Sequence, residues 1–190
     1  MRLEEFHESK NSIYLVLELL KGGELLNYIS KSNSLSYKDL WKVMKCIMKA
    51  LKYMNSQKIM HRDLKSDNMI LKKSAPLAEC ELKIVDFGLS TVYDIPEYLF
   101  KRCGTPGFVA PEVINAKSNT NIHYTPKCDV FSAGVIFYIL LTGRSPFHGK
   151  SFKEILKKNK LCNIDFNHPR LLNKKLAVDL LVRMLRKDPE

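Results

Sequence analysis

Long apolar runs are missing from this chain of 190 residues. The longest one, residues 130–141, is interrupted by Ser132 and Gly134 and is shorter than the roughly 20 residues that a transmembrane helix requires. We therefore expect it to form a buried central helix and not a membrane span. Residues 1–5, with the sequence MRLEE, also lack the apolar segment of a secretion signal. Both absences argue against a membrane partner.

Cysteine is scarce, and its spacing excludes a metal finger. The five cysteines are Cys46, Cys80, Cys103, Cys128 and Cys162. None of them forms the closely spaced pairs that are typical of zinc ligands. Scattered cysteines in odd number are typical of reduced thiols, so we expect the protein in the cytoplasm, with the nucleus as the alternative.

Acidic residues are outnumbered, since 31 lysines and arginines face 20 aspartates and glutamates and leave a net charge of +11. Such a charge is compatible with a nucleic-acid partner. The basic residues are spread along the chain, however, with clusters at residues 150–160 and 174–187, and no aromatic-rich strand or finger pattern accompanies them. We therefore expect a basic solvated surface and no nucleic-acid partner. Salt-sensitive binding to DNA or RNA would contradict this.

Apolar periodicity and breaker residues predict a mostly helical chain with a few short strands. Strands are expected at residues 13–18, 69–72 and 82–85, and helices at residues 24–30, 36–58, 152–159 and 173–187. Ser36 and Asp39 have the spacing of a capping box at the start of the long helix. Thr125 and Pro126 predict the cap and first turn of the central helix, which Gly143 closes.

Three short motifs occur in the sequence in a specific order. They are HRDLKSDN at residues 61–68, DFG at residues 86–88 and APE at residues 110–112. This set resembles the eukaryotic protein kinases, and the resemblance covers essentially the whole chain. It implies the α+β protein-kinase-like fold, represented here mostly by the α-helical C-lobe together with the last small-lobe strands and the hinge.

The resemblance also divides the chain as a partial kinase domain, residues 1–190. Residues 1–17 match the end of the N-lobe, residues 18–23 the hinge, and residues 24–190 a C-lobe that is incomplete at its C-terminus. The glycine-rich loop, the strand lysine and its glutamate partner have no counterpart in the sequence. The chain also stops two residues before the arginine expected to pair with Glu112. We therefore expect a fragment of a larger kinase that is catalytically silent on its own.

The motifs imply phosphoryl transfer from ATP, which needs positioning and charge neutralisation more than covalent chemistry. Asp63 matches the residue that accepts or orients the proton of the attacking hydroxyl. Lys65 would place a positive charge on the transferring phosphoryl group, and Thr105 would hydrogen-bond both residues. Asn68 and Asp86 supply hard oxygen ligands, which suit Mg²⁺.

Residues 13–25 resemble the last small-lobe strand, the hinge and the helix that follows. By this resemblance Leu17 is the gatekeeper beside the adenine. The carbonyl of Glu18 and the amide and carbonyl of Leu20 would bind the purine edge, and Ile70 would form the apolar floor. Specificity for ATP would therefore depend on the backbone of the hinge.

Lys65 and the sequence GTP at residues 104–106 are typical of serine/threonine kinases. Four segments resemble the calcium/calmodulin-dependent group of kinases. They are YLVLE at 14–18, GGEL at 22–25, CGTPGFVAPE at 103–112 and LTGRSPF at 141–147. Glu24 and Asp67 match positions at which related basophilic kinases hold an arginine upstream of the target hydroxyl. The resemblance thus implies protein substrates with upstream basic residues. It also implies calmodulin or another calcium sensor as a partner of segments outside these 190 residues.

Two alternatives to a kinase stay open at this point, a basic nucleic-acid-binding module, which only the net charge favours, and a pseudokinase or scaffold. A pseudokinase or scaffold would keep the fold without turnover, although the intact Asp63, Lys65, Asn68 and Asp86 argue against it.

The activation segment carries Lys101 where relatives often have a phosphorylatable threonine, so activation by phosphorylation at that position is not expected. Arg62 matches the arginine that usually binds the phosphate of that threonine. Without it, Arg62 would pair with Glu97 or phosphorylated Tyr98, or stay unpaired.

Overall fold

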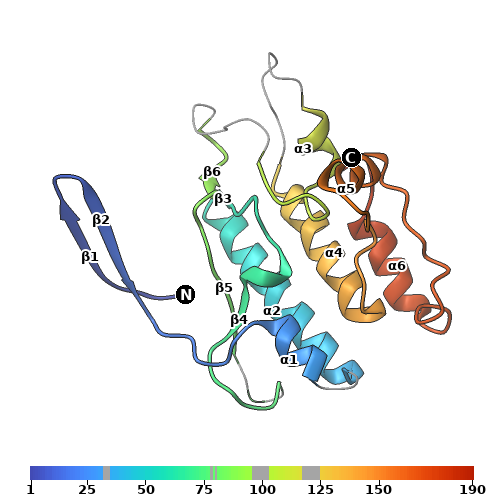
Figure 1. The fold of residues 1–190 in the computed structure, drawn as a ribbon, viewed down its shortest axis with the longest axis horizontal. Helices are drawn as coiled ribbons and strands as arrows, with labels where there is room; N and C mark the ends of the chain where they lie inside the picture. The colour runs from blue at the N-terminus through green and yellow to red at the C-terminus, as the bar shows by residue number, and fades with distance from the viewer. Residues whose placement is uncertain (32–34, 78, 80, 96–102, 117–124) are drawn as a thin grey trace. The chain divides into compact units, whose positions relative to one another are not determined.

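The computed structural model describes residues 1–31, 35–77, 79, 81–95, 103–116 and 125–190. These residues form two compact units. The first unit comprises Met1–Val43 and Ser66–Asp86, and the second comprises Met44–Lys65 and Phe87–Glu190. Short sheets and several helices together confirm the expected α+β class (Figure 1).

The first unit contains two antiparallel strand pairs. Strand β1 (Leu3–Ser9) pairs with β2 (Ser12–Leu17), and β4 (Met69–Leu71) pairs with β5 (Leu82–Ile84). The sequence predicted β2, β4 and β5 but missed β1, because its charged residues mask the alternation of a strand. The helix α1 (Leu25–Lys31) and the 3-10 turn η1 (Ser66–Asn68) contact each other.

The hinge segment, residues 18–23, is fastened to the strand β4. The amide of Gly22 donates to the carbonyl of Leu71 (2.9 Å), and the amide of Lys21 donates to the carbonyl of Lys72 (3.0 Å). A Cβ atom on Gly22 would lie 2.5 Å from the carbonyl oxygen of Lys73. Only glycine allows this close approach of two backbones.

The long helix α2 (Tyr37–Ser56) begins as the capping box predicted. The amide of Asp39 donates to the hydroxyl of Ser36 (3.1 Å), and that hydroxyl donates to the carboxylate of Asp39 (2.6 Å). The apolar stripe of the helix is buried, as expected, at Leu40, Val43, Met44, Ile47, Leu51 and Met54. Burial of this stripe stabilises the helix far more than its propensity does.

The second unit is built around α4 (Lys127–Thr142), which is buried along nearly its whole length. Its C-terminal cap is Gly143, as predicted, with φ of 80° and an amide that donates to the carbonyl of Ile139 (2.8 Å). At its N-terminus the helix begins within one residue of the prediction. Pro126 precedes Lys127 with a helical backbone (φ −53°, ψ −11°). The hydroxyl of Thr125 accepts from the amide of Lys127 (3.4 Å), and its carbonyl accepts from the amide of Cys128 (3.0 Å).

Three further helices and one strand pair complete the second unit. They are the helices α3 (Pro111–Asn115), α5 (Phe152–Leu161) and α6 (Lys175–Met184), and a strand pair formed by β3 (Ile59–Met60) and β6 (Thr91–Val92). Figure 1 shows α6 beside α4, in agreement with their contacts. Within the described part of the chain, no helix has both the length and the apolar character needed to cross a bilayer.

Candidate active site

The segment predicted to be the catalytic loop, residues 61–65, follows β3 and is held by a carboxylate of the central helix. The amides of His61 and Arg62 donate to Asp129 (2.7 and 2.9 Å). Arg62 adopts a left-handed backbone with φ of 66°, which a non-glycine residue tolerates only when its surroundings fix it. Asp129 therefore fixes the strained turn that leads into Asp63.

Sequence analysis missed Asp129, although one signal was available. Asp129 is an acidic residue in the first turn of an otherwise apolar helix and is only 3% exposed. Burial raises the pKa of Asp129 above its ordinary value, even though the two amide donors act in the opposite direction. A carboxyl group kept in such a place needs partners, and the catalytic loop supplies them.

Asp63, Lys65 and Thr105 meet in one cluster. The hydroxyl of Thr105 donates to Oδ1 of Asp63 (2.6 Å), and the ammonium group of Lys65 lies 3.0 Å from Oδ2. Lys65 also donates to the hydroxyl of Thr105 (3.3 Å). The two hydrogen bonds expected of Thr105 are thus present. They tie the catalytic loop to the segment 103–110 that precedes α3.

The surroundings of Asp63 favour its charged form. Burial of the carboxyl group opposes ionisation, but hydrogen bonds from Thr105 and Lys65 together outweigh it and lower the pKa of Asp63. The carboxylate is therefore ready to accept a hydrogen bond or a proton at neutral pH. Its positive neighbour is suited to stabilise a developing anion nearby.

The segment 103–110 turns tightly over the catalytic loop. Gly104 has φ of 110°, and a Cβ atom there would lie 2.9 Å from the carbonyl oxygen of Arg62. The carbonyl of Thr105 accepts from the amides of Phe108 (3.0 Å) and Val109 (3.2 Å). The hydroxyl of Ser132 on α4 donates to the carbonyl of Phe108 (2.9 Å). The backbone of this segment is consequently well determined.

The guanidinium group of Arg62 has a partner in the chain. Its Nε donates to the carbonyl of Leu89 (2.6 Å), next to the contact between the rings of His61 and Phe87, whose centroids are 5.0 Å apart. The other predicted partners, Glu97 and Tyr98, lie outside the described residues, as does Lys101. Arg62 thus bonds a backbone carbonyl just after the DFG motif without any phosphate.

Asn68 and Asp86 belong to the first unit and flank the β4–β5 pair. The carbonyl of Asn68 accepts from the amide of Val85 (3.0 Å). Asp86 follows Val85 directly, so Asn68 and Asp86 lie at the same end of this strand pair. Asp86 has a left-handed backbone with φ of 63°. No cluster of three or more His, Cys, Asp or Glu side chains suited to a metal occurs among the described residues.

This donor set nevertheless fits Mg²⁺. Magnesium is usually bound by one or two protein carboxylates together with water and substrate phosphates, not by a complete protein cage. One carboxylate from Asp86 and one amide oxygen from Asn68 match that requirement in chemistry. They would suit zinc or copper poorly, because both donors are hard oxygens.

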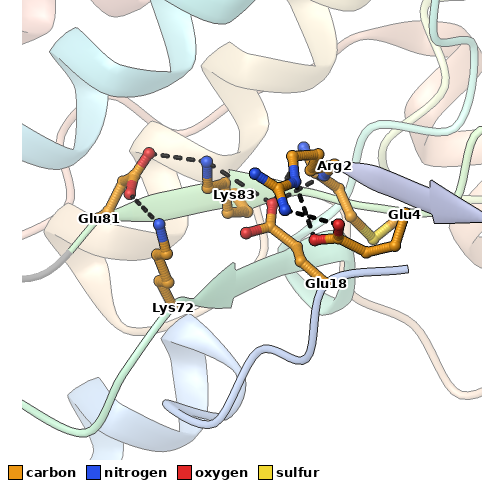
Figure 2. Close-up of polar contacts among 7 residues, drawn as sticks. Arg2, Glu4, Glu18, Lys72, Glu81 and Lys83 are labelled. Carbon is orange, nitrogen blue, oxygen red and sulfur yellow. Dashed lines mark hydrogen bonds and ion pairs between the residues drawn. The ribbon is translucent and has the colours of Figure 1, made fainter. Parts of the chain in front are cut away.

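The carboxylate of Glu18, at the start of the hinge segment, is the centre of a polar network in the first unit (Figure 2). It accepts from the amide of Arg2 (2.8 Å) and lies 3.7 Å from the ammonium of Lys83. Lys83 also pairs with Glu81 (2.7 Å), which in turn pairs with Lys72 (3.2 Å). Hydrogen bonding to Glu81 raises the pKa of Lys83, and the same hydrogen bond lowers the pKa of Glu81.

The remaining predicted nucleotide contacts lie on the first unit as well. Leu17 ends β2 and is 38% exposed, and Ile70 on β4 forms an isolated bridge with Glu24. Within the described residues, neither the amide nor the carbonyl of Leu20 forms a hydrogen bond. The amide and the carbonyl of Leu20 are therefore available to a ligand, whereas the amides of Glu18 and Lys21 on either side are bonded to other segments of the backbone.

Glu24 and Asp67 stand on elements that contact each other, just before α1 and within η1. Both side chains are exposed. Glu24 accepts from the side-chain Nδ2 of Asn27 (3.0 Å), and Asp67 accepts from the hydroxyl of Ser66 (3.3 Å). The carboxylates retain further acceptor capacity toward a cation from solvent.

Comparison with known proteins agrees with this geometry. The family described as protein kinase domain matches residues 1–190. Probable serine/threonine-protein kinase 2 of Plasmodium falciparum is 39% identical over 100% of this chain, which covers 36% of that protein. CBL-interacting protein kinase 11 of Oryza sativa is 38% identical over 100% of the chain and 36% of its own length. Calcium-dependent protein kinase 5 of Plasmodium berghei is 41% identical over 84% of the chain and 27% of its own length. The chain thus spans about a third of these relatives or less.

Proposed function

Because the chain belongs to the protein kinase domain family, we propose that its protein transfers the γ-phosphoryl group of Mg-ATP to serine and threonine hydroxyls of proteins. The observation that carries this proposal is the cluster in which Asp63 accepts from Thr105 at 2.6 Å and pairs with Lys65 at 3.0 Å. Such a transferase needs an ionised carboxylate beside a cation, both held rigidly, and this cluster provides them.

In this proposal Asp63 orients the substrate hydroxyl and takes up its proton. The hydroxyl oxygen forms a bond to the γ-phosphorus while the bond to the leaving ADP oxygen breaks. Lys65 stabilises the negative charge on the transferring group. Thr105 keeps both side chains in register with the segment that faces the protein substrate.

Two residues of the first unit would hold magnesium, which supplies charge neutralisation on the ATP phosphates when it is bound. They are Asn68 and Asp86, whose oxygens suit this ion. The adenine would lie on the hinge, with the carbonyl of Glu18 and the amide and carbonyl of Leu20 on its polar edge. Leu17 and Ile70 would cover it with apolar surface. The unused backbone groups of Leu20 support this placement.

We further propose a preference for substrates with a basic residue upstream of the target hydroxyl. The support is the pair of exposed carboxylates on contacting elements, Glu24 and Asp67. An arginine can bond two carboxylates at once. A peptide array probed with the full-length protein should show enrichment of upstream arginine or lysine. The Glu24→Gln/Asp67→Asn double variant should lose it, and an array without such enrichment in the wild type would remove the proposal.

A calcium sensor is the partner that the names of two relatives suggest, since one is called calcium-dependent and the other CBL-interacting. We propose that calmodulin or a related sensor acts through segments outside these 190 residues. Calcium-dependent stimulation of the full-length protein would support this. Equal activity in calcium and in chelator would contradict it.

The alternative function is a pseudokinase or scaffold that keeps the fold without turnover. ATP turnover by the full-length protein, compared with its Asp63→Asn variant, separates the two. The isolated 190 residues should be silent in the same assay, because they contain no glycine-rich loop and no strand lysine. Robust phosphotransfer by the isolated chain would overturn that expectation.

A further inference from the structure

The helix α5 carries one buried polar residue that the proposed mechanism does not use. Asn159 is 0% exposed, although most of its neighbours on α5 face solvent. Its Oδ1 accepts from the amide of Gly107 (3.0 Å). Its Nδ2 is buried and has no hydrogen-bond partner among the described residues. Sequence analysis passed over Asn159 because a polar residue in an amphipathic helix ordinarily faces water.

Gly107 lies in the segment that Thr105 ties to Asp63. It has φ of 94°, and a Cβ atom there would lie 3.3 Å from Cγ2 of Ile155 on α5. The segment is therefore held at two points two residues apart. Thr105 fixes it to the catalytic loop, and Asn159 fixes it to α5.

Asn159 leaves one buried donor, its own Nδ2, without an acceptor. An apolar side chain of similar volume would instead leave the buried amide of Gly107 without one, so stability alone does not distinguish the two choices. What an apolar side chain cannot do is fix the direction of the Gly107 amide, and with it the peptide planes next to Thr105. The contact thus contributes order in the segment.

We propose that Asn159 is a positioning residue for the protein substrate, acting through the Gly107 amide. This inference rests on the proposed function, in which the segment 103–110 faces the peptide that carries the target hydroxyl. Asn159 sets the path of that backbone and hence the affinity for the peptide. Binding of ATP, which involves the hinge, does not depend on it.

The test compares two variants of the full-length protein, one that removes the acceptor for the Gly107 amide and one that keeps it. Asn159→Leu removes the acceptor and the orphan donor together. It should raise KM for a peptide substrate about three- to tenfold, the effect of one lost hydrogen bond. KM for ATP and kcat should change less than about twofold, and Tm should change little, because the loss of the orphan Nδ2 is offset by the buried amide of Gly107, which loses its acceptor.

Asn159→Asp keeps the acceptor for Gly107 but buries a carboxylate. It should keep the peptide KM near the wild-type value while Tm falls. Asn163→Leu is the matched control, because Asn163 is exposed and lies four residues further on. It should leave the peptide KM unchanged. A wild-type peptide KM in Asn159→Leu, or a parallel loss of Tm, peptide affinity and ATP affinity, overturns the proposal.

Amide hydrogen exchange at Gly107 separates this inference from the proposed function. Exchange should be faster in Asn159→Leu than in the wild type and in Asn163→Leu. If the wild type phosphorylates no peptide, the proposed function fails, and the exchange comparison still decides whether Asn159 orders the segment. Equal exchange in all three proteins contradicts the positioning role.

Discussion

At the scale of single residues, Asp63 is held from two directions that come from distant parts of the chain. Asp129 on α4 fixes the turn before it through the amides of His61 and Arg62. Thr105 contacts the carboxylate itself at 2.6 Å. The position and the charge of Asp63 are thus controlled by different residues, so they can be perturbed separately.

Thr105→Val tests the control of charge, because it removes the hydroxyl and nearly preserves the shape. The hydrogen bond from Thr105 lowers the pKa of Asp63, so its loss should raise that pKa. The acid limb of kcat/KM should therefore move to higher pH, and kcat/KM at neutral pH should fall on the order of tenfold. An unchanged pH profile in steady-state kinetics would contradict this.

At the scale of elements, close helix packing in the second unit depends on a missing side chain. Gly134 lies in the middle of α4, and a Cβ atom there would come within 2.9 Å of Leu185 and Met184, at the end of α6. Glycine is unfavourable inside a helix by about 1 kcal/mol relative to alanine. Here the contact between α4 and α6 requires it.

Gly134→Ala should consequently destabilise the protein despite the better helix propensity of alanine. Overpacking of this kind costs about 1–3 kcal/mol. Urea denaturation should show the loss, whereas Leu176→Ala on α6 should stay within about 0.5 kcal/mol, because Leu176 is 88% exposed. A stabilised Gly134→Ala variant would show that the two helices do not pack as described.

The short helix α3 carries Glu112 without an ion pair to any described residue. Burial raises the pKa of Glu112, and the nearby charge of Asp188 adds to this. A raised folded-state pKa means that the contribution of Glu112 to stability is complete below its unfolded pKa of about 4.3 and is lost as pH rises through the folded value.

Glu112→Gln should therefore stabilise the 190-residue chain at pH 7. This is a distinctive outcome, because a typical substitution lowers the free energy of unfolding by about 1 kcal/mol. The advantage should shrink as pH falls through the raised pKa of Glu112 and should be lost below the ordinary pKa of glutamate. Urea denaturation of both proteins across this pH range measures the difference. A constant difference at every pH would mean that folding does not shift the pKa of Glu112, and a loss at pH 7 would mean that Glu112 has a cationic partner.

Sequence patterns predicted the elements whose signals are local. The apolar stripe of α2, the capping box at Ser36 and the glycine that closes α4 all follow from spacing within one helix. Strand β1 was missed because its charged residues pair with β2 through the backbone, which leaves little trace in side-chain type. Asp129 and Asn159 were missed because their partners are backbone amides far away in sequence.

At the scale of the whole molecule, the chain belongs to the protein kinase domain family and divides into two units. The second unit carries Asp63, Lys65 and Thr105, and the first carries the predicted hinge, Asn68 and Asp86. The family assignment follows from the sequence alone, whereas the phosphotransfer assigned to these residues is our proposal.

The most direct test of this account is the rate at which the full-length protein transfers labelled phosphate from Mg-ATP to a serine- or threonine-containing peptide, with and without Asp63→Asn. The account predicts transfer by the wild type that falls at least about hundredfold in the variant, because the proton of the attacking hydroxyl loses its acceptor. Equal rates in the two proteins would contradict it, since the phosphoryl transfer would then not depend on the cluster around Asp63.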